Sequence, residues 1–276
     1  MLERIKSAGV LILVFGSVVV LSVFFKIAID IAISIICIAA VYEFCKAIKT
    51  LKLFQISITS MAFAGIYPLL FMYDLSYILF FGYTAIMMFM IVFCHEKISF
   101  KDFAYTYSIT LLITICMSAI VSMKELDSDH RIMYFVMAIA VPWLADVGAY
   151  FTGVFFGKHK LCPKISPKKT VEGAIGGVCF CILTTIVIAL LFRSLIFDLI
   201  FHDVIEINYL SLIIIGVGGS VLSILGDLSF SVIKRAYSVK DYGDVIPGHG
   251  GILDRFDSVI PFVPFMYIIL KYLPIV

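Results

Sequence analysis

The sequence predicts an all-α, polytopic membrane protein of about nine transmembrane helices, with a cytoplasmic N-terminus and the C-terminus outside. The mean hydropathy is +1.12 and only 14% of the 276 residues are charged, whereas soluble domains carry about 25% charged residues. Apolar runs of about 20 residues, the length that crosses a bilayer core, recur along the whole chain. Lys and Arg side chains gather at alternate ends of these runs. These three observations favour a membrane protein over a soluble one.

Nine apolar runs, each bounded by charged or turn residues, are expected to form the helices. They cover residues 8–25, 27–45, 55–73, 75–94, 103–122, 132–156, 171–192, 208–233 and 258–275. The first run resembles a signal peptide, but it lacks a small-residue cleavage site and a second run follows at once, so we expect a retained span. In the eighth run, GVGGS at 216–220 is expected either to bend the helix or to let a neighbouring helix approach closely.

The distribution of positive charge predicts the orientation. With the N-terminus in the cytoplasm, 16 of the 21 Lys and Arg residues fall on the cytoplasmic side and 5 on the other, as the positive-inside rule requires. An odd number of spans and an outside C-terminus follow. The chain has neither a Ser/Gly/Pro linker nor an evident internal repeat, so residues 1–276 are expected to form a single integral-membrane domain. The seven cysteines show no CxxC pair and are expected to be reduced.

Carboxylates inside apolar runs mark candidate site residues, because a charge at membrane depth is costly unless it is paired, hydrated or bound to metal. Asp146 is followed by glycines that let backbones or a ligand come close. Asp227, Ser231, Lys234 and Arg235 are spaced i, i+4, i+7 and i+8, which predicts one polar face on an otherwise apolar helix. The alternative is that Lys234 and Arg235 only anchor the helix end in the cytoplasm.

The polar segment KRAYSVKDYGDVIPGHGGILDRFDS at 234–258 predicts a binding loop. Pro247 and the glycines around it exclude a helix there, and successive backbone N–H groups in such a loop can form an anion-binding nest. Asp254 and Asp257 lie one helical turn apart, with Arg255 between them. Paired carboxylates beside phosphate-directed cations supply the oxygen ligands that Mg²⁺ prefers.

A second basic cluster, KHKLCPKISPKKTVEGAIGG at 158–177, leads into the seventh run. Ser166 or Thr170 is expected to cap this helix, and Lys168 and Lys169 near its positive end favour a bound phosphate. Taken alone, the lysines of this cluster are also explained as topology signals. Together with the loop at 234–258, they predict a cytoplasm-facing pocket for phosphate transfer on a lipid.

The segment SVIKRAYSVKDYGDVIPGHGGILDRFD, from Ser231 to Asp257, resembles the signature of the CDP-diacylglycerol synthases, also called phosphatidate cytidylyltransferases. It has their Ser, hydrophobic-Lys-Arg, Lys-Asp, Pro-x-His-Gly-Gly and Asp-Arg-hydrophobic-Asp. The similarity extends to ADVGAYFTGVFFGKHKL and ISPKKTVEGAIGG, and so covers roughly residues 140 to 260. We therefore expect residues 131–276 to be the catalytic half and residues 1–130 to be an N-terminal multi-span region.

The resemblance implies the reaction CTP + phosphatidate → CDP-diacylglycerol + pyrophosphate, a Mg²⁺-dependent step of phospholipid biosynthesis. By the family's pattern the expected metal ligands are Asp227 and Asp254, with Asp146 as a third contact. The residues expected to bind substrate phosphate are Ser166, Lys168, Lys169 and Ser231. Those expected to serve catalysis, on the phosphates or by shaping the loop that contacts the nucleotide, are Lys234, Arg235, Lys240, Asp241, His249, Arg255 and Asp257.

The expected partners are CTP, phosphatidate and the lipid bilayer, and no nucleic acid. A second cation beside Mg²⁺ and a homodimer stay open. The resemblance also implies the cytoplasmic (inner) membrane of a bacterium, with the active site facing the cytoplasm.

Two alternatives stay open. An ion-coupled transporter also buries carboxylates in a helical bundle, but it has no evident need for the loop at 234–258. Another CTP-dependent lipid enzyme is nearer, either a polyprenol kinase or a cytidylyltransferase acting on a different lipid phosphate. The products separate these, because a kinase yields CDP and a phosphorylated lipid, whereas cytidylyl transfer yields pyrophosphate.

Overall fold

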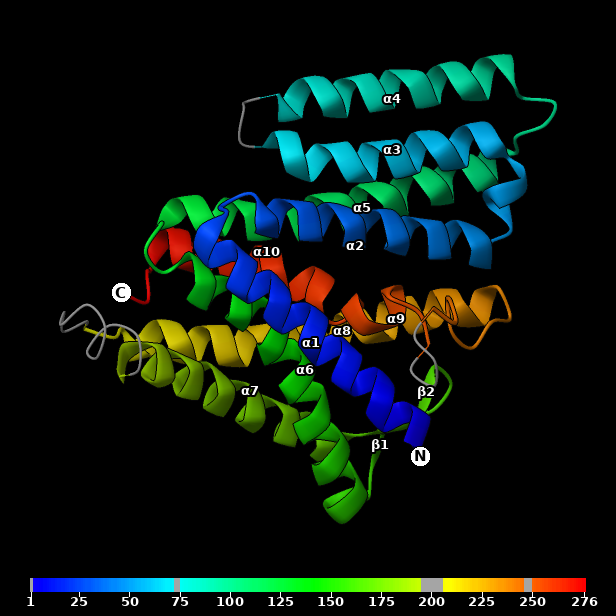
Figure 1. The fold of residues 1–276 in the computed structure, drawn as a ribbon. Coiled ribbons are helices and arrows are strands. Elements are labelled where there is room, and N and C mark those ends of the chain that lie inside the picture. The colour runs from blue at the N-terminus through cyan, green and yellow to red at the C-terminus, as the bar shows by residue number, and fades with distance from the viewer. Residues whose placement is uncertain (1, 72–74, 195–205, 246–249) are drawn as a thin grey trace. The chain divides into compact units, whose positions relative to one another are not determined.

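The computed structural model describes residues 2–71, 75–194, 206–245 and 250–276, and the chain is helical over most of this length (Figure 1). Each predicted run overlaps one helix, although residues 72 and 73 of the third run lie outside the described residues. The cysteines are free thiols, as expected. The elements in chain order are α1 (Leu2–Phe24), α2 (Ala28–Ala47), the 3-10 helix η1 (Thr50–Lys52), α3 (Phe54–Leu70), α4 (Ser76–Phe93), α5 (Phe100–Leu126), α6 (Arg131–Phe156), β1 (Lys160–Cys162), β2 (Ser166–Thr170), α7 (Val171–Phe192), α8 (Tyr209–Ala236), α9 (Leu253–Phe256) and α10 (Val259–Tyr272).

Within the described residues, six helices are long and apolar enough to cross a membrane: α2, α4, α5, α6, α7 and α8. Gly9–Phe24 of α1 and the whole of α3 form shorter apolar helices. The 14 residues of α10 extend only about 21 Å at 1.5 Å per residue. The chain is therefore an integral membrane protein, while the count of nine spans and the placement of the two termini stay predictions.

The chain divides into two compact units that do not follow the order of the sequence. The first unit combines Met1–Ser122 with Lys234–Phe256, and the second combines Met123–Ile233 with Asp257–Val276. Most of the signature segment thus belongs to the unit built by the N-terminal helices. The single integral-membrane domain stays a prediction.

In the first unit, α2 packs along α3, and α3 packs along α4 (Figure 1). Phe63 and Tyr83 stack between α3 and α4 with ring centroids 4.3 Å apart, and the Tyr83 hydroxyl is 3.0 Å from that of Ser60. Ser99 starts α5, because its hydroxyl accepts the Asp102 N–H and donates to the Asp102 carboxylate at 2.7 Å. Such polar pairs matter in lipid, where apolar burial alone does not drive helices together.

In the second unit, α6 lies closely along α7, and α10 packs on α6. Gly148 of α6 lies against the Phe180 ring, where a Cβ would overlap the side chain. α8 continues unbroken through GVGGS, and Gly216 lies against the backbone of Ile182 in α7. Of the two expectations for these glycines, close helix approach is therefore confirmed, and the bend stays a prediction.

The antiparallel pair β1–β2 corrects the expectation of a purely helical chain. Lys160 pairs with Thr170 and Cys162 with Ser166, with an irregularity in register between the two pairs. Lysines and prolines give this segment little strand propensity, so the sequence did not reveal it. The hairpin forms because α6 and α7 pack side by side, and the chain between their adjacent ends must turn back on itself.

Candidate active site

The loop at 234–258 carries a buried ion pair. Lys234 Nζ donates to Asp254 Oδ1 at 2.8 Å, and the two side chains are 9% and 6% exposed. Asp254 Oδ2 accepts two further hydrogen bonds, from the backbone N–H of Tyr242 at 2.7 Å and of Gly251 at 3.1 Å. A buried charge persists when its partners satisfy it in this way. The carboxylate is therefore held in one orientation.

Tyr242 and Gly250 let the chain wrap around Asp254. The buried Tyr242 ring centroid lies 5.4 Å from Lys234 Nζ, a cation–π contact, and 6.3 Å from the ring of Phe44 in α2. Gly250 has a φ of +84°, in the left-handed region that side chains disfavour. Sequence reasoning missed Tyr242, whose aromatic ring directly after the Lys-Asp pair was the available signal.

The other predicted residues of this loop are placed differently. Lys240 and Asp241 are exposed, and Arg255 is half-buried. His249 lies outside the described residues. Arg235 corrects the expected polar face of α8: Ser231 and Lys234 are buried, whereas Arg235 is exposed. The reason is that consecutive helix positions are about 100° apart, so the i+7 and i+8 positions do not share one environment.

Tyr237, just after the end of α8, anchors the chain that leads into the loop. Its ring packs edge-on against Tyr105 at 5.9 Å, and Lys101 Nζ lies 5.8 Å from the centroids of both rings. Burial raises the pKa of Tyr237, because the phenolate would lose its hydration.

The second basic cluster places a lysine on a predicted metal ligand. Lys169 Nζ forms an ion pair with Asp227 Oδ2, and both side chains are about one quarter exposed, at 25% and 24%. Side chains alternate along a strand, so the neighbouring Lys168 of β2 points away from Lys169 and is exposed. Ser166, at the start of β2, is half-buried. The hairpin thus places Lys169, but not Lys168, in an ion pair with Asp227 of α8.

Two side chains at the start of α7 hold this hairpin in place. Thr170, not Ser166, caps the helix, and its hydroxyl accepts the Gly173 N–H at 3.1 Å. The Glu172 carboxylate accepts the backbone N–H of Lys158 at 3.1 Å and that of His159 at 3.2 Å, and lies 2.7 Å from His159 Nδ1. Glu172 was not among the predicted site residues, although it is an acid beside the lysine cluster.

The remaining predicted residues of the second unit lie on helices. Asp146 is half-buried on α6, and Ser231 is buried on α8. Asp257 is also buried, and its Oδ1 accepts the Ser258 N–H at 2.8 Å. Asp254 belongs to the first unit and Asp227 to the second. Their sharing of one metal ion therefore stays a prediction, as does the third contact from Asp146.

Carboxylate and lysine side chains dominate the candidate site. In the part of the chain that the structure describes, no three His, Cys, Asp or Glu side chains come together as a metal-binding group. Mg²⁺ commonly takes only one or two carboxylates and completes its shell with waters and substrate phosphates. The carboxylate oxygens of Asp227 and Asp254 are thus of the ligand type that Mg²⁺ prefers.

Sequence reasoning missed Glu43 of α2. Its buried carboxylate accepts the backbone N–H groups of Ile252 and Leu253, immediately before Asp254. The signal was present in the sequence, because Glu43 is an acid inside the apolar stretch IAAVYEFC.

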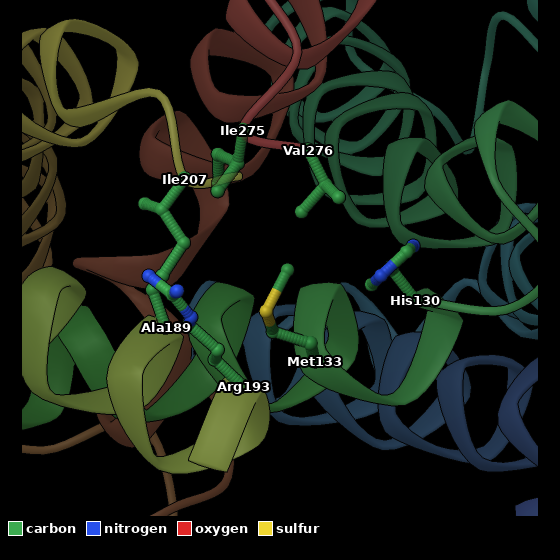
Figure 2. Close-up of a pocket in the computed structure, with 7 residues that line it drawn as sticks. All are labelled: His130, Met133, Ala189, Arg193, Ile207, Ile275 and Val276. Carbon is green, nitrogen blue, oxygen red and sulfur yellow. The ribbon is translucent and has the colours of Figure 1, made fainter. Parts of the chain in front are cut away.

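A small cavity in the second unit lies away from these residues. Figure 2 shows Met133 of α6, Ala189 of α7 and Ile275 of the C-terminal segment among its lining residues. Met133 is separated from Asp146 by about 20 Å along α6, at 1.5 Å per residue. The cavity is therefore at the other end of the α6–α7 pair from the hairpin and includes none of the predicted site residues.

Comparisons with known proteins agree with the signature. The model of the Cytidylyltransferase family matches residues 2–273. A phosphatidate cytidylyltransferase of Bacillus subtilis (strain 168) is 41% identical over 172 residues, which are 62% of this chain and 60% of that protein. Proteins of the same name from Haemophilus influenzae (strain ATCC 51907 / DSM 11121 / KW20 / Rd) and Staphylococcus aureus (strain COL) are 42% and 45% identical over 139 and 144 residues. These matches cover 50% and 51% of this chain, and 46% and 49% of the two proteins. The chain thus spans about half to three fifths of the relatives' length.

Proposed function

Because the chain belongs to the cytidylyltransferase family, we propose that it transfers a cytidylyl group from CTP to phosphatidate and releases pyrophosphate. The observation that carries the proposal is the segment Ser231–Asp257. It resembles the signature of the phosphatidate cytidylyltransferases, and it holds Lys234 and Asp254 as a buried pair bonded to the loop backbone.

The chemistry matches the charged residues. In the reaction, an oxygen of the lipid phosphate attacks the α-phosphorus of CTP, the bond from that phosphorus to the bridging oxygen breaks, and pyrophosphate leaves. A phosphate monoester is largely ionised near neutral pH, since its second pKa is about 6, so the nucleophile needs little general base. The main requirement is to bring two polyanions together and to stabilise the leaving group, which cationic side chains do.

The lysines and arginines divide these tasks in our proposal. Lys168 and Arg235 are exposed and meet the incoming phosphates. Lys169 and Lys234 form ion pairs with the carboxylates of Asp227 and Asp254, which hold the two ammonium groups in fixed positions. Arg255, half-buried in α9, contributes a further cation. Preorganised charge of this kind stabilises the transition state without reorganising when the reaction occurs.

Mg²⁺ is part of the proposal. The residues that would hold it are Asp227 and Asp254, with Asp146 as a third contact. Both Asp227 and Asp254 already pair with a lysine ammonium group, so Mg²⁺ would share each carboxylate with that lysine or replace it. When bound, the ion would neutralise charge on the phosphate oxygens.

The location follows from the same proposal. We place the protein in the cytoplasmic membrane of a bacterium, with the loop at 234–258 on the cytoplasmic side, where CTP is available. The excess of Lys and Arg on that side of the predicted map supports this orientation, with 16 of the 21 residues.

The experiment that tests the function is a turnover assay. Purified protein in phosphatidate-containing micelles is incubated with Mg²⁺ and CTP labelled in the α-phosphate. We expect label in a CDP-lipid and an equal amount of pyrophosphate. Formation of CDP with a phosphorylated lipid would instead identify a kinase, and solute flux in proteoliposomes without CTP would identify a transporter. Either result, or no product, would refute the proposal.

A further inference from the structure

Glu43 lies near the C-terminal end of α2 and is 1% exposed. A buried carboxylate is unfavourable unless its oxygens are hydrogen-bonded. Glu43 Oε1 accepts the Ile252 N–H at 3.0 Å, and Oε2 accepts the Leu253 N–H at 2.9 Å. The donors are 209 and 210 positions away in the sequence. Both oxygens thus bind the turn at the start of α9.

Two glycines of the loop at 234–258 pack against the same carboxylate. A Cβ at Gly243 would overlap Glu43 Oε1, and a Cβ at Gly251 would overlap Oε2. The backbone therefore comes closer to Glu43 than any residue with a side chain allows. The second glycine of the His-Gly-Gly motif is explained by this contact.

Residues next to Glu43 strengthen the contact between α2 and the loop. The Phe44 ring packs against Tyr242, with centroids 6.3 Å apart. Lys46 Nζ pairs with Asp244 at 3.4 Å, but these side chains are 51% and 89% exposed. A surface pair of that kind contributes little. The buried contacts of Glu43 and Phe44 are therefore the ones that fix the loop.

The turn held by Glu43 is also the turn that holds Asp254. The Gly251 N–H donates to Asp254 Oδ2, and Leu253 directly precedes Asp254. The Tyr242 N–H, beside the Phe44 ring, donates to the same oxygen. Movement of this turn would shift Asp254 relative to Lys234.

We propose that Glu43 is a positioning residue for cytidylyl transfer, which holds the turn at 250–254 so that Asp254 and Lys234 meet the substrates in one geometry. This inference rests on the proposed function for its catalytic readout. Glutamine cannot replace Glu43, because its amide N–H₂ would face a backbone N–H donor. Aspartate is shorter by one methylene, so its carboxylate does not reach the N–H groups of Ile252 and Leu253.

The test compares Glu43→Gln with Asp244→Asn, a change in the exposed pair at the same loop. Amide hydrogen exchange of purified protein reports on the contact, and initial rates of CDP-lipid formation report on its role. In Glu43→Gln we expect faster exchange at Ile252 and Leu253, and about a tenfold to hundredfold fall in kcat with little change in the KM for CTP, as misplacement of reacting groups produces. Asp244→Asn should change neither.

Unchanged exchange and kcat in Glu43→Gln would overturn the proposal. A fall in kcat that only matches the loss of folded protein, measured by size-exclusion chromatography, or an equal effect of Asp244→Asn would also overturn it. If the wild-type protein forms no CDP-lipid, the proposed function fails, and the exchange data still decide whether Glu43 holds the turn.

A second pair of variants tests the contact itself. Gly251→Ala should disturb the turn because its Cβ overlaps Glu43 Oε2. Glu43→Ala removes that overlap, so the two substitutions should be non-additive in their effect on exchange at Ile252. Additive effects would show that Gly251 and Glu43 do not contact each other.

Discussion

Substitutions at Asp254 separate its charge from its hydrogen bonds. Asp254→Asn keeps an acceptor for the loop N–H groups but removes the negative charge that Asp254 presents to Lys234, whose side chain is 9% exposed. Breaking a buried ion pair in this way costs about 3–5 kcal/mol. Asp254→Ala also leaves the N–H groups of Tyr242 and Gly251 unbonded, which adds about 1–3 kcal/mol for each group that water does not reach. Alanine should therefore destabilise the protein more than asparagine.

The free energy of unfolding, measured by denaturant titration in mixed micelles, checks this order. A loss of about 3–5 kcal/mol is a large share of a typical total of about 5–15 kcal/mol, so the effect should be evident. Asp244→Asn, in an exposed pair, is the matched control and should change stability by less than about 1 kcal/mol. If asparagine and alanine at position 254 are both as stable as the wild type, the loop does not depend on the buried pair.

Three further predictions concern the proposed site. Asp227→Asn should abolish CTP-dependent product formation while membrane insertion, measured by resistance to alkaline extraction, stays intact; near-normal turnover would remove Asp227 from the site. Thr170→Val removes the hydroxyl that caps α7 and should lower the free energy of unfolding by about 1 kcal/mol. Thr170→Ser keeps a hydroxyl and should not lower it. Equal stability of the wild type and both variants would contradict the cap. Chelation of divalent cations should stop turnover and added Mg²⁺ should restore it, and undiminished turnover in chelator would exclude the ion.

The helices were predictable from the sequence because their signal is local. Each apolar run is long and bounded by charged or turn residues, and each overlaps a helix. The Thr170 cap was also predictable, since capping depends on a few adjacent residues. The β1–β2 hairpin was not, because its residues lack strand propensity and pair only where α6 and α7 bring their ends together.

The candidate site was predictable in its residue types but not in its partners. The ion pair between Lys169 and Asp227 joins β2 to α8, which are separated in the sequence by α7. No spacing in the sequence predicts this pair. Arg235 was misplaced because a difference of one helical position decides between burial and exposure. Glu43 was missed because its role depends on a contact 209 and 210 positions away.

These non-local contacts bear on what the N-terminal helices do. The signature resemblance is confined to the C-terminal half, yet Lys234–Phe256 belongs to the compact unit of Met1–Ser122. The loop provides the donors that hold Asp254, but it depends on Glu43 and Phe44 of α2 to fix the turn in which those donors lie. Substitutions in α2 should therefore alter the proposed reaction even though no residue of α2 is expected to touch a substrate. We therefore expect α2 to act as part of the scaffold of the proposed site.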